Sequence, residues 1–423
     1  MIACKAVCRQ AGIANAIAFD MGGTTAKAGV ISEGHVLTTG TALVGGYERA
    51  LPVQIPMIDI VEVGTGGGSI AFLSEGGALR VGPRSAGASP GPACYALGGD
   101  EPTVTDANLL LGRLGASRFL GGEMRLDSRA AERALYGRVA APLGMNLIEA
   151  ANGIVRIAVT QMAYAVKGVT TARGLDAGHF VLVAYGGAGP LHASQIARET
   201  GIRRVLIPRA PGHFSACGML FCDLRYDFVQ TRFTKLDDLD FGEFLDIFGR
   251  MEEEGRRAVN GSGTGATDLR ITRALDMRYV GQEHLVTIEI PPHHFERHDR
   301  AAIKRLFDEE HAQRYGTSAR AEGAEIASLR SSVTGLMVKP EFEHIATGTT
   351  EPPRLAMRGA RPAWFETGVI DTPVFDRDLL EAGNRIPGPA LIEEHASTTV
   401  LLPGDELTVD PAGNLLLSVN ADG

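Results

Sequence analysis

The chain has 423 residues, of which 44% are hydrophobic and 22% charged, so it is long enough for two or three domains with a large core. Its 41 basic and 50 acidic side chains give a formal charge of −9, which opposes binding to nucleic acid or to an acidic membrane surface. The five cysteines contain no CxxC pair and no segment reaches the length of a membrane span, so we expect a cytoplasmic protein.

The first element in the chain is a short helix, expected at residues 3–12. This start is neither long nor apolar enough for a signal peptide. Because the helix begins abruptly, we expect a preceding segment that is absent or supplied by another chain.

The next segment, residues 16–30, is an apolar run that reaches Asp20 and then a Gly-Gly-Thr-Thr sequence before it resumes. This pattern predicts a β-hairpin with a polar tip at residues 22–25. Glycine amides that converge on one point bind anions, threonine hydroxyls add donors, and Asp20 can hold a metal ion through water. The tip suits the β- and γ-phosphates of a nucleotide, although a glycine pair that serves only the turn explains the same pattern.

A second glycine-rich segment follows a strand expected at residues 35–43. Residues 61–73 contain an apolar strand, a glycine run with hydroxyls at residues 66–69, and a return strand. Two such tips in one sheet indicate one shared ligand, whereas a flexible hairpin turn is the alternative interpretation.

Residues 82–99 form a long loop that carries Arg84, Cys94 and Tyr95. Loops of this length in compact domains tend to be functional or disordered, and the embedded side chains favour function. The loop leads to a helix expected at residues 107–114. Asp106 is then either the N-cap of that helix or a carboxylate that faces metal or substrate.

Helices are expected over residues 128–175, the longest at 146–174. After them, a buried strand at residues 180–185 enters a Gly-Gly-x-Gly turn, Pro190 begins a helix through Thr200, and residues 204–208 return as a strand. This is a β-turn-α-β unit in which a ring or a phosphate can approach the backbone. The glycine spacing is not the dinucleotide fingerprint.

The remainder of the chain suggests two further segments. Helices are expected at residues 237–260 and 300–315, with strands at 269–290 and 324–338, and a proline-rich break at 347–353 precedes short strands and turns. We therefore expect a core domain at residues 1–230, an α+β region at 231–346 and a small β module at 347–423. The histidines near residue 294 fit a solvated turn better than a metal site.

Several motifs occur in the order seen in the hydantoinase A/5-oxoprolinase family and cover nearly the whole chain. They are Asp20-Met-Gly-Gly-Thr-Thr25, Gly66-Gly-Gly-Ser-Ile70, Ser85-Ala-Gly87 with Gly91-Pro-Ala-Cys-Tyr95, Glu101-Pro-Thr-Val-Thr-Asp-Ala-Asn108, Tyr185-Gly-Gly-Ala-Gly-Pro190 and Arg278-Tyr-Val-Gly-Gln282. The chain resembles N-methylhydantoinase A and the ATP-binding subunits of acetone and acetophenone carboxylases. This resemblance implies an α/β fold: an actin-like ATPase (ribonuclease-H-like) domain, then an α+β region and a small C-terminal β module.

The chain departs from the family pattern at two places. Nothing before Asp20 can supply the first Gly-Gly-Thr phosphate loop of the family, so the chain resembles a truncated or split subunit. Ala26-Lys27 stands where the oxoprolinase-like pattern has Thr-Asp, which resembles members associated with hydantoin-type hydrolysis or ketone carboxylation.

The resemblance implies ATP-dependent hydrolysis of a cyclic amide, such as a hydantoin or 5-oxoproline, through a phosphorylated lactam. The chain would act as one subunit, with a hydantoinase B-type partner and a separate N-terminal phosphate-loop domain. An ATP-dependent carboxylase subunit for acetone-like or acetophenone-like ketones is the alternative within catalysis. A noncatalytic nucleotide-binding or assembly subunit is the alternative outside it.

The expected site follows from these motifs. The candidate catalytic residues are Asp20, Thr24, Asp106 and Arg84. The candidate ATP-binding residues are Gly22, Gly23, Thr24, Thr25, Gly66, Gly67, Gly68, Ser69, Gly186, Gly187 and Gly189. Asp20 is also the expected ligand of Mg²⁺ or Mn²⁺.

Overall fold

The computed structural model describes residues 1–39, 42–44, 51–53, 57–315 and 317–420. The chain forms two compact units, Met1–Leu220 with Glu341–Gly423 and Phe221–Pro340. The sequence predicts three segments instead. The difference arises because side chains between residues 386 and 419 pack in the same core as the strands at the start of the chain.

A mixed sheet forms the centre of the first unit, in the order β19-β22-β23-β12-β11-β1-β2-β3, with β8 also paired to β2. Its strands are β1 (Ala16–Met21), β2 (Ala26–Ser32), β3 (His35–Val36), β8 (Ile60–Val63), β11 (Val181–Tyr185), β12 (Arg204–Ile207), β19 (Arg385–Pro387), β22 (Glu406–Val409) and β23 (Leu415–Ser418). β1, β11 and β12 run parallel, and β1 and β2 form the predicted antiparallel hairpin. The carboxyl ends of β1 and β11 therefore lie side by side.

Alternating side chains of β1 pack on opposite faces of this sheet, because successive residues of a strand point to opposite sides. Ile17, Phe19 and Met21 belong to the large core beside helix α5 (Leu147–Val169). Ala16 and Ala18 belong to a smaller cluster with helices α1 (Ile2–Gln10) and α7 (Phe214–Met219).

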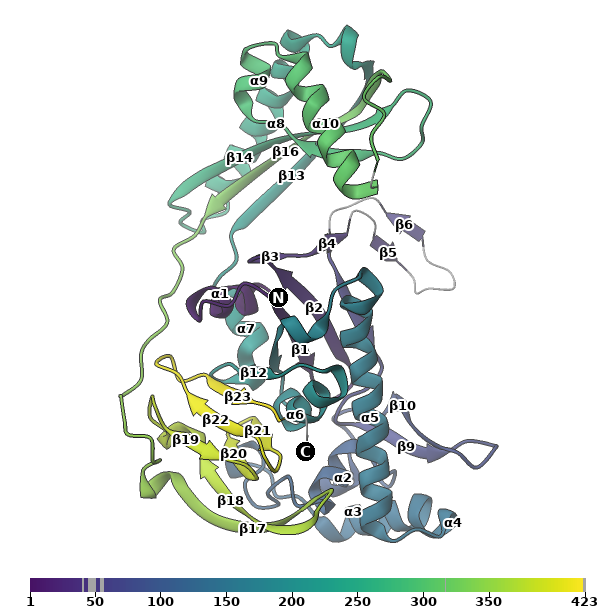
Figure 1. Ribbon diagram of the computed structural model, residues 1–423, viewed down its shortest axis with the longest axis vertical. Coiled ribbons are helices and arrows are strands. Elements are labelled where there is room, and N and C mark those ends of the chain that lie inside the picture. Colours follow the sequence, from purple (N-terminus) through teal and green to yellow (C-terminus); the bar gives the residue numbers. More distant parts are fainter. Residues whose placement is uncertain (40–41, 45–50, 54–56, 316, 421–423) are drawn as a thin grey trace. The chain divides into compact units, whose positions relative to one another are not determined.

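Helices cover both faces of the central sheet (Figure 1). The α-helices described in this unit are α1 (Ile2–Gln10), α2 (Val104–Leu110), α3 (Ser128–Leu135), α4 (Ala141–Leu143), α5 (Leu147–Val169), α6 (Gly189–Thr200) and α7 (Phe214–Met219). Asn146 caps α5 in a capping box with Glu149, one residue from the expected start. Within the described ranges, no helix is long and apolar enough to cross a membrane.

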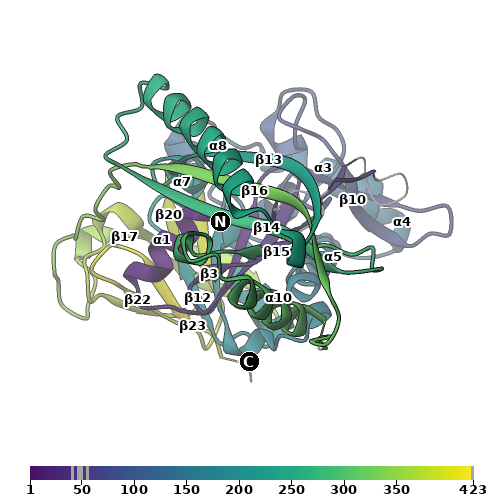
Figure 2. The same ribbon diagram turned by 90° about the horizontal axis from the view of Figure 1, so that it is seen from above.

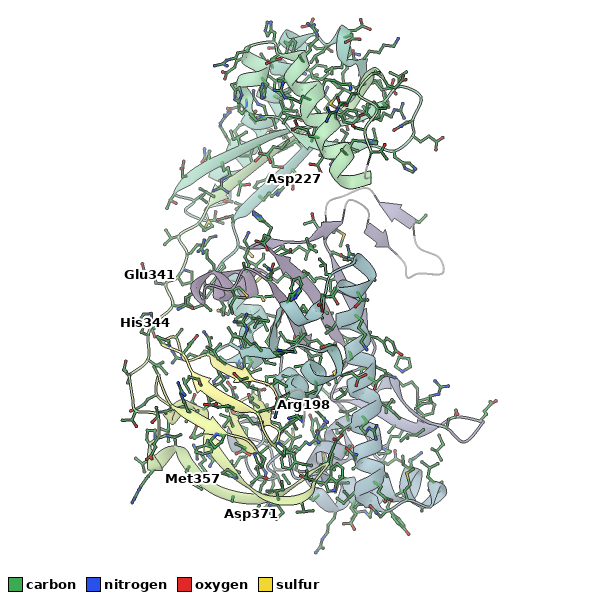
Figure 3. All side chains as sticks on the ribbon, in the orientation of Figure 1. Arg198, Asp227, Glu341, His344, Met357 and Asp371 are labelled. Carbon is green, nitrogen blue, oxygen red and sulfur yellow. The ribbon has the colours of Figure 1, made fainter. Side chains whose placement is uncertain are left out.

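The C-terminal part of the first unit contains a second sheet in the order β17-β18-β20-β21. Its strands are β17 (Met357–Phe365), β18 (Gly368–Asp376), β20 (Ala390–Glu394) and β21 (Ser397–Leu401). The sequence predicts this β-rich ending but not its attachment to the core domain. Arg198 of α6, labelled in Figure 3, donates hydrogen bonds of 2.9 Å to Pro403 O and to Asp405 Oδ1. The module is thus tied to the core domain by side chains as well as by strands.

Short strand pairs complete the first unit. They are β9 (Ser69–Leu73) with β10 (Leu79–Ser85), β4 (Thr38–Thr39) with β7 (Met57–Ile58), and β5 (Ala42–Val44) with β6 (Leu51–Val53). The strand expected at residues 35–43 is divided among β3, β4 and β5, and residues 40 and 41 lie outside the described residues.

The second unit is a four-strand antiparallel sheet among its described residues, in the order β13-β16-β14-β15, with α8 along it (Figure 2). Its elements are β13 (Leu224–Lys235), α8 (Phe241–Gly261), β14 (Asp268–Tyr279), β15 (Val286–Glu289), α9 (Pro292–Glu296), α10 (Arg300–Tyr315) and β16 (Ala324–Leu336). Phe244, Phe248 and Phe307 are members of its separate core. The boundary expected at residue 230 falls inside β13, whose strand pairing keeps both sides of that position in one unit.

Candidate active site

The tip of the β1–β2 hairpin is a tight turn at residues 22–25. The Gly22 amide donates to Thr25 O over 3.2 Å, and Gly23 and Thr24 are exposed. Gly22, Gly23 and Thr24 line a cavity of about 520 Å³. Exposed glycine backbone and a threonine hydroxyl at a turn of this kind suit an anion.

The second glycine run packs against this tip rather than forming a hairpin turn of its own. β8 pairs with β2 and β9 pairs with β10, so the strands on either side of residues 64–68 enter different sheets. The Gly67 amide donates to Gly22 O over 3.0 Å and the Gly68 amide to Gly23 O over 2.7 Å. Both residues line the cavity, but their amides hold the first turn in place.

Gly66 and Ser69 help to hold the second glycine run against the β1–β2 turn. A Cβ on Gly66 would lie 2.5 Å from Thr24 N and 2.6 Å from Gly23 O, so only glycine fits there. The Gly66 amide donates to Ser69 Oγ over 2.8 Å, and Ser69 is fully buried. Neither residue lines the cavity.

The third glycine run joins β11 to α6 beside the end of β1. Gly186 has φ +83°, and a Cβ there would lie 2.5 Å from Asp20 Oδ1. The Ala188 amide donates to Met21 O over 3.0 Å. Gly187 and Ala188 line the cavity, whereas Gly186 and Gly189 do not.

The structure therefore brings parts of all three glycine runs to one cavity. Apolar and aromatic side chains form much of the remaining wall, namely Tyr95, Val104, Leu114, Phe119, Leu120, Met124 and Leu191. The rings of Tyr95 and Phe119 are 5.6 Å apart, and burial raises the pKa of the Tyr95 hydroxyl to about 12, so it stays protonated. Such a wall can take an uncharged ring beside the glycine turn.

Asp20 lies at the end of β1 but does not line the cavity. Its Oδ2 accepts a hydrogen bond from Ser215 Oγ over 3.0 Å, and its Oδ1 lies against Gly186. Magnesium bound to nucleotide phosphates typically takes one or two protein carboxylates and several waters. One carboxylate beside a hydroxyl fits that donor set, and among the described residues no cluster of three His, Cys, Asp or Glu side chains is placed to hold a metal ion.

Asp106 is fully buried and does not line the cavity. It is the third residue of α2, whose N-cap is Thr103, and it completes a capping box. Its oxygens accept hydrogen bonds from the amides of Ala93, Cys94 and Thr103 and from the Thr103 hydroxyl, at 2.7–3.2 Å. Asp106 thus holds the 82–99 loop on α2, and the buried carboxylate also contributes to the raised pKa of the Cys94 thiol, after burial itself.

Arg84 is also outside the cavity wall. Its side chain is 61% exposed and forms an ion pair with Glu101 at 2.8 Å. Of the four candidate catalytic residues, only Thr24 lines the cavity.

The tip of the β20–β21 hairpin also forms part of the cavity wall, although the sequence assigns this hairpin to a separate module. Residues 393–398 line it, and the hairpin pairs Glu394 with Ser397. His395 Nε2 lies 3.2 Å from Glu123 Oε1, and Ala396 O lies against Gly187. The polar Glu-Glu-His-Ala-Ser-Thr sequence marks a turn, but no local pattern places that turn beside residues some 200 positions earlier.

Asn108 and His192 form a buried polar pair in the same wall. Asn108 Nδ2 lies 3.4 Å from His192 Nε2 and donates to Val104 O over 2.9 Å. Burial and the neighbouring Arg113 guanidinium lower the pKa of His192 to about 3, so the imidazole is neutral. The position of His192 among the small and apolar residues of the first half of α6 (residues 189–194) is the sequence signal that could have identified it.

Two family models match this chain. The hydantoinase/oxoprolinase model matches residues 1–228, and the hydantoinase/oxoprolinase C-terminal domain model matches residues 241–417. Together they cover most of both units.

Three curated relatives align over nearly the whole chain. An uncharacterized protein of Methanocaldococcus jannaschii is 40% identical over 94% of the chain and 58% of its own length. The caprolactamase subunit alpha of Pseudomonas jessenii is 34% identical over 97% of this chain and 59% of its own length. The acetophenone carboxylase gamma subunit of Aromatoleum aromaticum is 33% identical over 96% of this chain and 56% of its own length. The chain thus spans less than two thirds of the length of each relative.

Two solved structures share the fold. The ATP-dependent caprolactamase of Pseudomonas jessenii superposes with a TM-score of 0.78 at 34% identity, over 99% of this chain and 60% of the other. A nucleotide-free acetone carboxylase superposes with a TM-score of 0.84 at 24% identity, over 98% of this chain and 60% of the other. This likeness agrees with the expected actin-like ATPase fold and β-rich ending. The chain therefore belongs to the hydantoinase/oxoprolinase family.

Proposed function

We propose that the chain binds MgATP and takes part in the ATP-dependent ring opening of a cyclic amide, as one subunit of a larger enzyme. The observation that carries this proposal is the single cavity in which residues 22–24, Gly187 and an apolar, aromatic wall meet. A glycine turn suits phosphates, and an apolar wall suits an uncharged ring. The likeness to an ATP-dependent caprolactamase and to a caprolactamase alpha subunit, both 34% identical, supports ATP and a cyclic amide as the two substrates.

The chemistry requires activation because an amide carbonyl is a poor electrophile. The carbonyl oxygen attacks the γ-phosphorus, the bond from that phosphorus to the β,γ-bridging oxygen breaks, and ADP leaves. Water then adds to the carbonyl carbon, and the carbon–nitrogen bond breaks as the nitrogen takes a proton. The resulting acyl phosphate is hydrolysed by a second water to an amino acid and phosphate.

The residues of this chain would supply position and charge stabilisation. The Thr24 hydroxyl and the exposed amides of the turn would hold phosphate oxygens. Asp20, oriented by Ser215, would hold Mg²⁺, which when bound offsets phosphate charge. Gly67 and Gly68 would act indirectly, since their amides fix the turn.

The remainder of the enzyme would come from other polypeptide segments. The chain spans 56–59% of the length of the three relatives described above, two of which are subunits by name. We propose that a separate N-terminal phosphate-loop domain covers the nucleotide and that a hydantoinase B-type subunit completes the enzyme.

Calorimetry of MgATP binding to the chain tests the nucleotide half of this proposal. Thr24→Val and Asp20→Asn should each weaken MgATP binding by about tenfold or more, because hydrogen bonds and ligand contacts to charged groups are strong. Asp20→Asn should affect metal-free ATP far less. Thr231→Val, an exposed threonine change in β13, is the matched control. Equal MgATP affinity in Thr24→Val, Asp20→Asn and the control would remove the proposal.

Phosphate release by the reconstituted complex tests the substrate half. Release that depends on ε-caprolactam, hydantoin or 5-oxoproline would support the amide hydrolase. The 33% identity to an acetophenone carboxylase subunit favours a second candidate, ketone carboxylation. Release that requires both bicarbonate and a ketone would establish that alternative instead.

A further inference from the structure

Several buried polar atoms in the cavity wall have no hydrogen-bond partner. Among the described residues they are Asn108 Oδ1, His192 Nδ1, Ser397 Oγ and Glu393 Oε2. Most buried polar groups in proteins are satisfied, and leaving one unpaired is unfavourable. A ligand that completes their hydrogen bonds would therefore gain affinity.

The orientation of the Asn108 amide is determined by its neighbours. The atom that faces Val104 O must be a donor, so it is Nδ2, and the same NH₂ group faces His192 Nε2. The imidazole is neutral, so Nε2 can accept. Both hydrogens of the amide are thus directed to protein atoms, and Oδ1 remains as an acceptor.

Ser397 contributes a hydrogen-bond donor, where Asn108 contributes an acceptor. It begins β21 at the tip of the hairpin and is 7% exposed. Its hydroxyl carries a hydrogen that no described atom accepts. It can therefore donate to an occupant of the cavity.

This combination favours an uncharged ligand over a phosphate. An acceptor such as Asn108 Oδ1 repels phosphate oxygens, and neither Asn108 nor Ser397 carries a charge to offset theirs. An amide in a small ring is held in the cis form, which open secondary amides rarely adopt, so its C=O and N–H lie along one edge. The apolar wall described above can take the rest of such a ring.

We infer that Ser397 and Asn108 determine the substrate specificity of the cavity: the Ser397 hydroxyl donates to the carbonyl oxygen of a cyclic secondary amide, and Asn108 Oδ1 accepts its N–H. This inference rests on the proposed function, which it extends by naming the residues that contact the ring. It also assigns a substrate contact to the C-terminal β module.

Ligand-detected NMR titration of the full chain tests the inference. The probes are ε-caprolactam, 2-pyrrolidinone and hydantoin; each lactam is compared with its N-methyl derivative, and hydantoin with 1,3-dimethylhydantoin, which has no ring N–H. At least one unmethylated ring should bind. Methylation should weaken binding of that ring about tenfold, because it removes the N–H that Asn108 accepts; this arm tests Asn108 without altering the protein.

Two variants test Ser397. Ser397→Ala removes a hydroxyl that bonds to no described atom, so thermal stability should be unchanged while ring affinity falls about three- to tenfold. Thr399→Val is the matched control, because Thr399 is on the same strand, is fully buried and also has an unpartnered hydroxyl, but does not line the cavity. Its ring affinity should equal that of the wild type.

Three results would overturn the inference: no ring binds the wild-type chain, methylated and unmethylated rings bind equally, or Ser397→Ala and Thr399→Val bind rings equally. A Ser397→Ala variant that loses MgATP affinity but keeps its affinity for the ring would also overturn the inference. In that case the Ser397 hydroxyl would contact the nucleotide base and not the cyclic amide. Ring binding needs no nucleotide, so retained ring binding without MgATP binding would refute the proposed function and leave this inference standing.

Discussion

The neutral state of His192 is a property of one residue that should be visible in the pH dependence of stability. Its pKa in the folded chain is about 3, below the ordinary value of 6.5 that applies when the chain is unfolded. Between these values the unfolded state binds more protons, so the free energy of unfolding falls as pH decreases from 6.5 towards 3.

His192→Gln should reduce this acid sensitivity. The wild-type slope from His192 is at most about 1.4 kcal/mol per pH unit, and the variant should lose that contribution. Denaturant unfolding at several pH values measures it. His179→Gln, which changes an exposed histidine, should keep the wild-type slope. Parallel pH profiles for His192→Gln and wild type would show that His192 titrates normally.

Asp106 illustrates what sequence reasoning about a single residue can and cannot give. The sequence offers Asp106 as the N-cap of a helix at residues 107–114, but the helix begins at Val104, its N-cap is Thr103, and Asp106 completes the capping box as its third residue. Its contacts with Ala93 and Cys94 depend on the path of a long loop, which no local pattern specifies. The carboxylate could therefore be assigned to a helix terminus from sequence, but its loop-holding role could not.

At the scale of elements, the glycine run at residues 66–68 acts as a support for the β1–β2 turn. A methyl group on Gly66 would overlap backbone atoms of Gly23 and Thr24, which cannot move independently of the turn. Gly66→Ala should therefore shift the turn and lower the free energy of unfolding by about 1–3 kcal/mol. It should also weaken MgATP binding by about tenfold.

Circular dichroism melts and calorimetry measure these two effects. Gly137→Ala is the control, because nothing lies within 4 Å of a Cβ at that position. If Gly66→Ala behaves like Gly137→Ala in both measurements, the turn does not depend on the docking of residues 66–68.

Elements whose signals are local could be predicted well. The β1–β2 hairpin, α5 and the β11–α6–β12 unit follow from apolar periodicity, glycines and caps, and all three are observed. The pairing of β9 with β10 rather than β8, and the insertion of the β20–β21 tip into the cavity, depend on contacts between distant residues. Those contacts carry no period or spacing that a single sequence displays, so the part of the cavity wall formed by residues 393–398 could not be predicted.

At the scale of the molecule, the first unit needs its C-terminal segment. β23 pairs with β12 along residues 415–418, and Leu407, Leu415 and Leu417 belong to the main core. A chain that ends at residue 340 would expose these core contacts and the edge of β12. We expect it to be insoluble or to melt far below the full chain.

Expression and thermal unfolding of residues 1–340 beside the full chain measure this effect. Deletion of residues 421–423 alone, which lie beyond β23, is the control and should leave the melting temperature unchanged. A soluble 1–340 chain with the melting temperature of the full protein would contradict the shared core.

The pairing of β12 with β23 also has a consequence for protein synthesis. β12 leaves the ribosome about 200 residues before β23 does, and at translation rates of 5–20 residues per second this delay is roughly 10–40 s. During that interval the nascent sheet has an open edge with apolar neighbours, which other chains can join. The order of the chain thus makes the growing polypeptide a natural client for cotranslational chaperones until its last strands are added.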